Sequence, residues 1–321
     1  MQNERGSALL VTLLMLALMA ALAAELTIGF QTQLQRSRRV NASLQTKFAL
    51  LYAEKRAINT LQTAVLAPLH EQPDSEDLGE ETTVSWRAQD QQRCFNLNAL
   101  ANAPEEPLAE PPYEVKVFSA LLEKSNVDGA RAEEIIQSLA DDIDTNNTPR
   151  LRGAEDEYYQ RKSGKGFAAN QLLLTVDEAR QVKGMTEAIF QRLSPFICTQ
   201  FSNALSVNVN ALTERDAPLL AALFLNEISD SDAKALLRKR PEEGWQNVDA
   251  FLYQAQKEYS ATKTLVDALK KMIGVQSQYF RVDATARHGE FTVGMRSWLY
   301  YDEKNKTLRT WLRQLTAGDE E

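Results

Sequence analysis

An uncharged apolar run near the N-terminus is the feature that most constrains this chain. No residue from Ser7 to Ala24 is charged, and Glu25 is the first charge before the sequence LTIGF. As a helix that rises about 1.5 Å per residue, this run nearly crosses a hydrocarbon layer of about 30 Å, whereas the apolar part of a secretory signal peptide needs only about 7–15 residues. The small residues of ALAAE still leave an ordinary signal peptide open, cleaved after Ala23 or Ala24.

The sequence after the run continues the helix. Between Glu25 and Leu66 there is no proline and no turn cluster. Apolar residues recur there with helical spacing at Leu44, Phe48, Leu51, Ile58, Leu61 and Val65. Cleavage near Gly6 would therefore leave one long helix, with a membrane-spanning first part and a second part packed on a domain. Cleavage after Ala24 would leave only an amphipathic helix at the new N-terminus.

Segments of strand character flank a helical middle. After the helix, a break is marked by Pro68, Pro73 and the acidic run DSEDLGEE. The next segment, TTVSWRAQ, alternates like a strand, and CFNLNAL forms another short extended segment. From Val115 to about Ile273 the signals are helical, as in TVDEARQV, where Thr175 and Glu178 have the spacing of a capping box.

The C-terminal segment returns to strands. SQYFRVDATARHG, EFTVGMRSWLYYD and TLRTWLRQL are rich in β-branched and aromatic residues, and turn clusters separate them. The sequence therefore predicts an α+β fold in which a long N-terminal helix (residues 7–66) packs on a small antiparallel sheet. Residues 67–103 and 276–321 form this sheet, and a large all-α domain (residues 104–275) is inserted between them.

Composition argues against nucleic acid as a partner. The net charge is −8, so polyanions would repel the chain at long range. Helix-hairpin-helix modules that bind DNA phosphates resemble two segments, LLTVDEARQVKGMTEAIFQRL and LLAALFLNEISDSDAKALLRKR. However, residues 204–274 carry ten acidic and nine basic side chains, so they offer no electropositive surface. No nucleophile, zincin or phosphate-loop motif is present, so the sequence does not indicate an enzyme. An exported enzyme or binding domain behind an ordinary signal peptide is the competing interpretation.

The two cysteines, Cys94 and Cys198, lie far apart and form no CxxC pair. Neither a zinc ribbon nor a thioredoxin-like motif is therefore available. In an exported chain a structural disulfide between them is the natural interpretation, but their spacing alone leaves the pairing open.

An acidic loop carries the clearest ligand chemistry. In DDIDTNNTPRLRGAEDEYY, Asp142, Asp144 and Asn146 alternate as in the first half of an EF-hand loop. The rest departs from that loop, since Asn147 replaces its glycine and the glutamate arrives late, as Glu155 followed by Asp156. With oxygen ligands and neither cysteine nor histidine, Ca²⁺ fits best as the bound ion, and a solvated acidic loop is the alternative.

The N-terminus resembles the type III signal of type IV pilins and pseudopilins. A short polar leader (residues 1–6) ends in Gly6 and is followed directly by SALLVTLLMLAL. Those leaders are cut after the glycine, here between Gly6 and Ser7, and the apolar helix stays, with a methylated N-terminus. Val11 stands where most members have a glutamate, which resembles the K-type minor pseudopilin of type II secretion systems. CFNLNALA, SLADDIDTNNTPRLRGAEDEYY and SVNVNALTERDAPLLAALF resemble that family's blocks in the same order.

The resemblance implies a role and partners. K-type pseudopilins cap the periplasmic pseudopilus with the I- and J-type minor pseudopilins, help to start its assembly and support the export of folded proteins. The implied partners are these and other pseudopilins, the inner-membrane secretion platform, the prepilin peptidase and secreted cargo proteins. The resemblance also implies that the chain crosses the inner membrane once, with its bulk in the periplasm. The family also binds calcium in its α-domain. Asp141 and Asp144 match its paired aspartates, whereas Asp142 stands where the family usually has tryptophan.

One charge pattern opposes this orientation. The leader carries only Arg5, while Arg36, Arg38 and Arg39 follow the apolar run, contrary to the usual excess of positive charge on the cytoplasmic side. The orientation therefore rests on the cleavage pattern. The three arginines either lie against lipid headgroups or form a solvated helix face.

Overall fold

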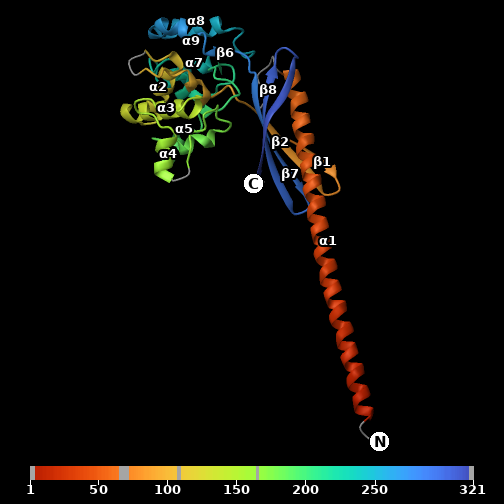
Figure 1. The fold of residues 1–321 in the computed structure, drawn as a ribbon. Coiled ribbons are helices and arrows are strands. Elements are labelled where there is room, and N and C mark those ends of the chain that lie inside the picture. The colour runs from red at the N-terminus through yellow and green to blue at the C-terminus, as the bar shows by residue number, and fades with distance from the viewer. Residues whose placement is uncertain (1–3, 65–71, 107–109, 164–165, 318–321) are drawn as a thin grey trace.

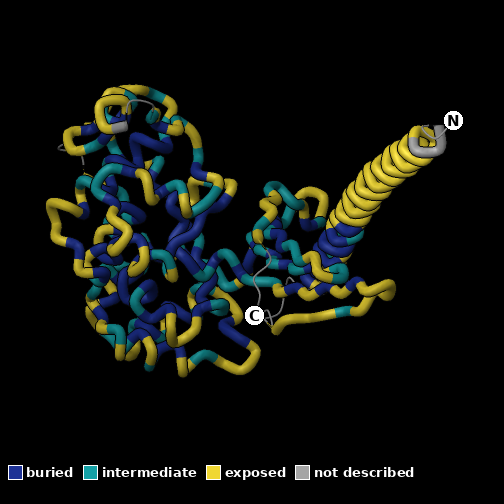
Figure 2. Tube along the Cα trace, turned by 90° about the horizontal axis from the view of Figure 1, so that it is seen from below, coloured by how far each residue is buried: buried dark blue, intermediate teal, exposed yellow. Residues whose placement is uncertain are grey.

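The computed structural model describes residues 4–64, 72–106, 110–163 and 166–317. Its helix α1 (Glu4–Ala64) extends far beyond the rest of the molecule (Figure 1). All described side chains from Ser7 to Asn41 are exposed, as the tube of Figure 2 shows for the free half of this helix. Among the described residues, α1 is the one helix long and apolar enough to cross a membrane. Residues 65 and 66, the predicted end of the helix, lie outside the described residues.

A five-stranded antiparallel sheet lies beside the second half of α1, with the strand order β1-β2-β7-β8-β9. Its strands are β1 (Asp74–Gly79), β2 (Thr82–Asp90), β7 (Tyr279–His288), β8 (Phe291–Asp302) and β9 (Thr307–Ala317). The prediction of strands on both sides of the helical middle is confirmed for β2, β7, β8 and β9. The turn between β7 and β8 contains Gly289 at a φ of +57°, a left-handed conformation that glycine adopts at little cost.

Strand β1 corrects the prediction of a break at the acidic run. Residues 74–79 pair with β2, and Asp74 lies opposite Trp86. All but one of the six are exposed, because β1 is the edge strand and neither of its faces contributes to the core. Charged residues on an edge strand hinder pairing with another chain. Because the residues of β1 are mostly exposed and polar, the apolar alternation by which strands are recognised is missing here.

The second half of α1 packs on one face of the sheet. Its buried side chains are mostly alanines, which allow a close approach of the helix backbone to the strands. The helix contributes Ala49, Leu50, Ala53, Ala57 and Leu61, and the sheet contributes Val84, Trp86, Phe280, Val282, Ala284, Ala286, Met295, Leu299 and Leu308. This spacing along α1 places its apolar side chains on one stripe of the helix surface.

Glu54 is a buried carboxylate in the middle of this contact. It is 4% exposed and accepts hydrogen bonds from Ser297 Oγ at 2.6 Å, Thr310 Oγ1 at 3.0 Å, and Arg313 Nε and Nη2, both at 2.7 Å. Burial acts to raise the pKa of Glu54, but the hydrogen bonds from Arg313 and Ser297 outweigh it, so the pKa lies below its ordinary value. Side chains of β8 and β9 thus satisfy the Glu54 carboxylate with hydrogen bonds. These contacts fix the position of the helix along the sheet.

We expect Glu54→Ala to lower the free energy of unfolding by about 2 kcal/mol, because it leaves buried donors without an acceptor. Denaturant unfolding of the full chain in detergent, followed by tryptophan fluorescence, measures this. Since the folded-state pKa is depressed, the stabilisation is present above the ordinary carboxyl pKa of 4.5 and is lost as the pH falls through the folded-state value. Arg56→Ala removes an exposed charge 3.7 Å from Glu76 and serves as the control. Equal midpoints for the two variants would contradict the role of Glu54.

The helical region lies between β2 and β7 in the sequence, as predicted, and the fold is α+β. Its longer helices are α2 (Tyr113–Lys124), α3 (Gly129–Ile143), α4 (Asp156–Ser163), α7 (Asp230–Arg238) and α8 (Val248–Glu258). Shorter helices are α5 (Glu187–Leu193), α6 (Ala217–Leu223) and α9 (Val266–Leu269), with 3-10 turns η1 (Leu97–Asn102), η2 (Val176–Gln181), η3 (Glu214–Asp216) and η4 (Ser260–Leu265). The predicted capping box of Thr175 and Glu178 is present, although it begins the 3-10 turn η2 and not an α-helix.

The segment CFNLNAL belongs to this helical region and not to the sheet, contrary to the boundary predicted at residue 103. Only Phe95–Asn96 (β3) is extended, and it pairs in parallel with Ile197–Cys198 (β4). Leu97 and Leu100 of the following turn are fully buried in the helical core. The apolar residues of this segment are thus covered by helices. A second short parallel pair, β5 (Val207–Asn208) with β6 (Ile273–Gly274), closes the other end of the region.

Polar contacts and a disulfide join the two parts where the chain passes between them. Cys94 and Cys198 are bonded, with Cα atoms 5.7 Å apart. Close by, the Asp90 carboxylate accepts hydrogen bonds from the Gln92 backbone N–H and from the Ser277 hydroxyl, and Asn208 donates to the same Ser277. The two connections between the sheet and the helical region, one after β2 and one before β7, are therefore fixed by buried groups.

Candidate metal centre

The acidic loop folds back on itself after α3. Asp144 ends that helix, and its Oδ1 accepts a hydrogen bond from Asn146 N at 3.0 Å. Asn146 Oδ1 in turn accepts from Thr148 N at 2.7 Å. Such side-chain turns are typical of aspartate and asparagine, and here they reverse the chain so that the start of α4 returns to the end of α3.

Three carboxylates meet at this point. Oxygen atoms of Asp141, Asp144 and Glu155 all lie within 4.8 Å of one another. Asp141 is fully buried and Glu155 is 4% exposed, while Asp144 is half-buried. Carboxylates this close repel one another unless a cation lies between them.

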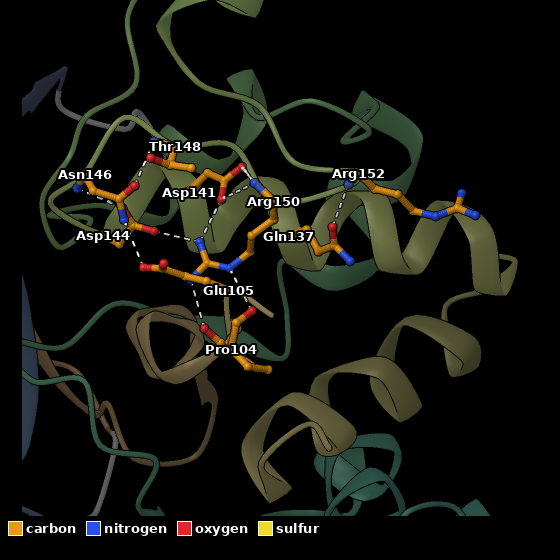
Figure 3. Close-up of polar contacts among 10 residues, drawn as sticks. Pro104, Glu105, Gln137, Asp141, Asp144, Asn146, Thr148, Arg150 and Arg152 are labelled. Carbon is orange, nitrogen blue, oxygen red and sulfur yellow. Dashed lines mark hydrogen bonds and ion pairs between the residues drawn. The ribbon is translucent and has the colours of Figure 1, made fainter. Parts of the chain in front are cut away.

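The Arg150 guanidinium supplies part of that positive charge. Figure 3 shows it between Asp141 and Asp144, and its Nη1 lies 2.7 Å from Asp141 Oδ1 and 2.6 Å from Asp144 Oδ2. It also donates to the carbonyl oxygens of Ala103 and Pro104 at 2.9 and 3.2 Å. Arg150 thus ties the acidic loop to the segment that follows η1. Even so, burial raises the pKa of Asp141 above its ordinary value, against the opposing effect of Arg150.

Glu155 has no such partner. Neither of its carboxylate oxygens has a hydrogen-bond donor among the described residues. Burial first, and then repulsion by Asp141 and Asp144, raises the pKa of Glu155 to about 7. Buried polar groups without a partner from the chain are rare in folded proteins, and they are explained by a bound ion, an ordered water or a functional role. A carboxylate-only set fits a hard cation such as Ca²⁺, which takes oxygen ligands and completes its shell with carbonyls or water.

The other predicted ligands have different contacts. Asp142 Oδ1 accepts from Ala169 N at 3.0 Å, and Asp156 Oδ1 accepts from Ala168 N at 2.9 Å, so both hold the segment after α4. Asn146, besides its turn with Thr148, donates from its amide to Glu105. The structure therefore brings together Asp141, Asp144 and Glu155 from the predicted set, while Asp142 and Asp156 stand outside this group and Asn146 shapes the loop. The EF-hand alternation favoured Asp142 beside Asp144, whereas in the structure it is Asp141, three residues before Asp144 at the end of α3, whose carboxylate lies close to that of Asp144.

Sequence reasoning did not identify Arg150 as part of this centre, nor the close approach between Gly153 and Asp141. The available signal for Arg150 was the presence of two arginines, Arg150 and Arg152, in a loop of carboxylates. Gly153 shows no sequence signal, because its role comes from a close approach. A Cβ atom at Gly153 would lie 1.8 Å from Asp141 Oδ2 and 3.2 Å from Arg150 N, so only glycine leaves room for the Asp141 carboxylate.

We expect Gly153→Ala to destabilise the metal-free protein by about 1–3 kcal/mol, because the new methyl group must displace a fully buried, hydrogen-bonded carboxylate. Thermal unfolding followed by circular dichroism measures the effect. The matched control is Gly129→Ala at the start of α3, where a Cβ atom would meet nothing within 4 Å. A Gly153→Ala protein as stable as that control would show that the close approach is not structurally important.

Comparison with known proteins assigns the chain to a family. A family model described as type II secretion system, protein K, matches residues 93–201, and a second model of the same description matches residues 207–276. A relative from Escherichia coli (strain K12) is 44% identical over 98% of this chain and 99% of its own length. The type II secretion system protein K of Klebsiella pneumoniae is 35% identical over 87% of this chain and 86% of its own. The chain belongs to the type II secretion system protein K family.

A solved structure extends this likeness to three dimensions. A chain in the crystal structure of the GspK-GspI-GspJ complex from enterotoxigenic Escherichia coli matches with a TM-score of 0.76 and 29% sequence identity, over 88% of this chain and 99% of that one. The first protein K model begins at residue 93, so it includes CFNLNAL with the helical region and spans the acidic loop. The carboxylate centre thus lies within the part of the chain that the protein K model describes.

Proposed function

We propose that this chain is a minor pseudopilin of a type II secretion system that assembles with the I- and J-type minor pseudopilins at the tip of the periplasmic pseudopilus. The observation that carries the proposal is the match over 88% of the chain to a chain in the crystal structure of the GspK-GspI-GspJ complex. The secretion machinery to which its relatives belong supports the same role.

The N-terminal half of α1 serves in this proposal as a membrane anchor that is retained after processing. Its apolar side chains are exposed, with Leu10 at 69% and Leu14 at 69%, and no other element of the described chain covers them. Such a surface needs lipid or partner helices around it. Cleavage between Gly6 and Ser7 would leave this whole surface in place.

Two features favour a place at the tip. Val11 offers no carboxylate for the N-terminal amine of a neighbouring subunit, so no subunit above this one is needed to neutralise a buried charge. The helical region also extends to one side of the sheet, away from α1 (Figure 1), where it would obstruct a neighbour stacked along a shaft. Either feature is compatible with a subunit that has neighbours on one end only.

We expect membrane-extracted protein to begin at Ser7 in intact-mass and N-terminal sequencing measurements. In assembled pseudopili, a label on the helical region should appear once per fibre, at an end. A mature chain beginning at Ala24 or Glu25 would instead indicate a secretory signal peptide and overturn the proposal. Labels distributed along the fibre would refute the tip position alone.

We further propose that the Asp141, Asp144 and Glu155 centre binds Ca²⁺ and so stabilises the helical region. Support comes from Glu155, whose buried carboxylate has no other described partner, and from the oxygen-only chemistry of the set. An ion there would bind the native state and not the unfolded chain, which stabilises folding by mass action.

The variant Glu155→Gln tests this proposal with opposite effects in the two states. Without calcium it should be as stable as the natural chain or more so, because an unpaired buried charge disappears. With calcium, the increase in the thermal midpoint seen for the natural chain should be absent, and isothermal calorimetry should detect no tight site. Glu157→Gln, at an exposed position of α4, is the control and should keep the full response. A natural chain that takes up no calcium would refute the metal site and leave the pseudopilin assignment unaffected.

A further inference from the structure

The helix between the apolar run and the sheet is strongly basic in an otherwise acidic chain. Residues 26–53 contain four basic and no acidic residues, whereas the whole chain has a net charge of −8. Arg36, Arg38 and Arg39 form the centre of this segment, and we name these three residues the basic collar. Each is exposed, and no carboxylate among the described residues lies in an ion pair with any of them. The fold therefore does not use these charges.

The collar lies where a membrane surface would be. From Ser7 to Phe30 the helix is about 36 Å long, enough to cross a hydrocarbon layer of about 30 Å with some tilt. Arg36 follows about 9 Å after Phe30, and the headgroup layer on each side is about 5–8 Å thick. The first buried side chain of α1 is Ala42, so the collar precedes the folded body.

The side chains point in the direction that this location requires. In an α-helix every Cα–Cβ bond is tilted toward the N-terminus, which here is the side of the apolar run. Long arginine side chains can therefore extend back toward the headgroups while their alkyl parts cover apolar surface. A guanidinium group binds phosphate oxygens through two parallel hydrogen bonds.

The collar covers slightly less than half of the circumference of the helix. At about 100° per residue, Arg38 lies about 200° and Arg39 about 300° around the helix axis from Arg36. The three side chains therefore lie within an arc of about 160°, over which their long alkyl parts can spread. Lipid headgroups surround a spanning helix, so they can reach every guanidinium group in this arc.

We infer that the basic collar binds the phosphate groups of anionic phospholipids at the membrane surface nearest the folded body. The inference rests on the membrane anchor of the proposed function and adds a lipid class to it. The contact holds α1 at a fixed depth, with the sheet a short distance above the headgroups. It also offsets the orientation penalty of positive charges on this side of the membrane, because anionic headgroups neutralise them.

The test uses the full chain with Phe30→Trp, which places a fluorescent reporter at the end of the apolar run. The protein is reconstituted into vesicles of equal parts phosphatidylglycerol and phosphatidylcholine, with one of the two lipids brominated near the headgroup end of its acyl chains. Quenching by each brominated lipid gives the relative association constant of the anionic lipid. Without any lipid preference this constant is one. We expect it to be larger, by a factor of roughly five for each arginine that contacts an anionic headgroup. High salt should reduce it.

Two variants with the same loss of charge separate the collar from general electrostatics. Replacing Arg36, Arg38 and Arg39 by Gln should return the relative association constant to about one. Replacing Lys47, Lys55 and Lys304 by Gln, which removes the same charge from the folded body and its part of α1, should leave it unchanged.

Each contrary result has a distinct meaning. Equal quenching by the two lipids in the chain with an intact collar would overturn the inference, and loss of the I- and J-type pseudopilins on purification of the collar variant would then assign the arginines to a protein contact. No quenching by either lipid would show that Phe30 is not at a membrane, which overturns the anchor of the proposed function together with the inference.

Discussion

The pairing of β2 with β7 is the constraint on which the rest of the architecture depends. These strands are neighbours in the sheet, with Asp90 opposite Phe280, although the whole helical region separates them in sequence. The first and last residues of the helical region must therefore lie about one strand spacing apart. Residues at both passages meet this demand, because Asp90, Asn208 and Ser277 share hydrogen bonds and the Cys94–Cys198 disulfide lies beside them. A disulfide that closes a loop of this length restricts the unfolded chain considerably, so it stabilises the junction without enlarging the core.

The same sheet also determines what α1 can do. One helix passes through two environments, with exposed leucines in its first half and buried alanines in its second. The alanines let the backbone lie close to β2 and β7, and Glu54 then adds a directional contact to β8 and β9. A purely apolar stripe would allow the helix to slide or rotate on the sheet. The buried carboxylate with its several donors specifies one position, so the direction in which the exposed first half of α1 leaves the body is determined by this contact.

How much of this was predictable depended on whether the signal was local. The long helix, four sheet strands and the insertion of helices between them followed from periodicity and from β-branched and aromatic content. Strand β1 was missed because an exposed edge strand of acidic residues has no apolar alternation, and CFNLNAL was misplaced because a short extended segment does not reveal what covers it. In the candidate centre, Asp141, Asp144 and Glu155 were all among the predicted ligands. Choosing them over Asp142 and Asp156 required the direction of each side chain, and Gly153 required a distance between atoms that are remote in the local pattern.

The charge balance of the candidate centre would allow an arginine and a cation to share it. Arg150 neutralises one of the two aspartates that it contacts, and Glu155 adds another carboxylate without adding a donor. With all of these groups ionised, the centre has a net charge of −2, which a divalent cation offsets and a monovalent one does not. Arg150 therefore does not have to leave for an ion to bind. Because the same guanidinium also holds the carbonyls of Ala103 and Pro104, the ordering of the acidic loop is coupled to the segment that leads from the disulfide-bonded junction into the helical core.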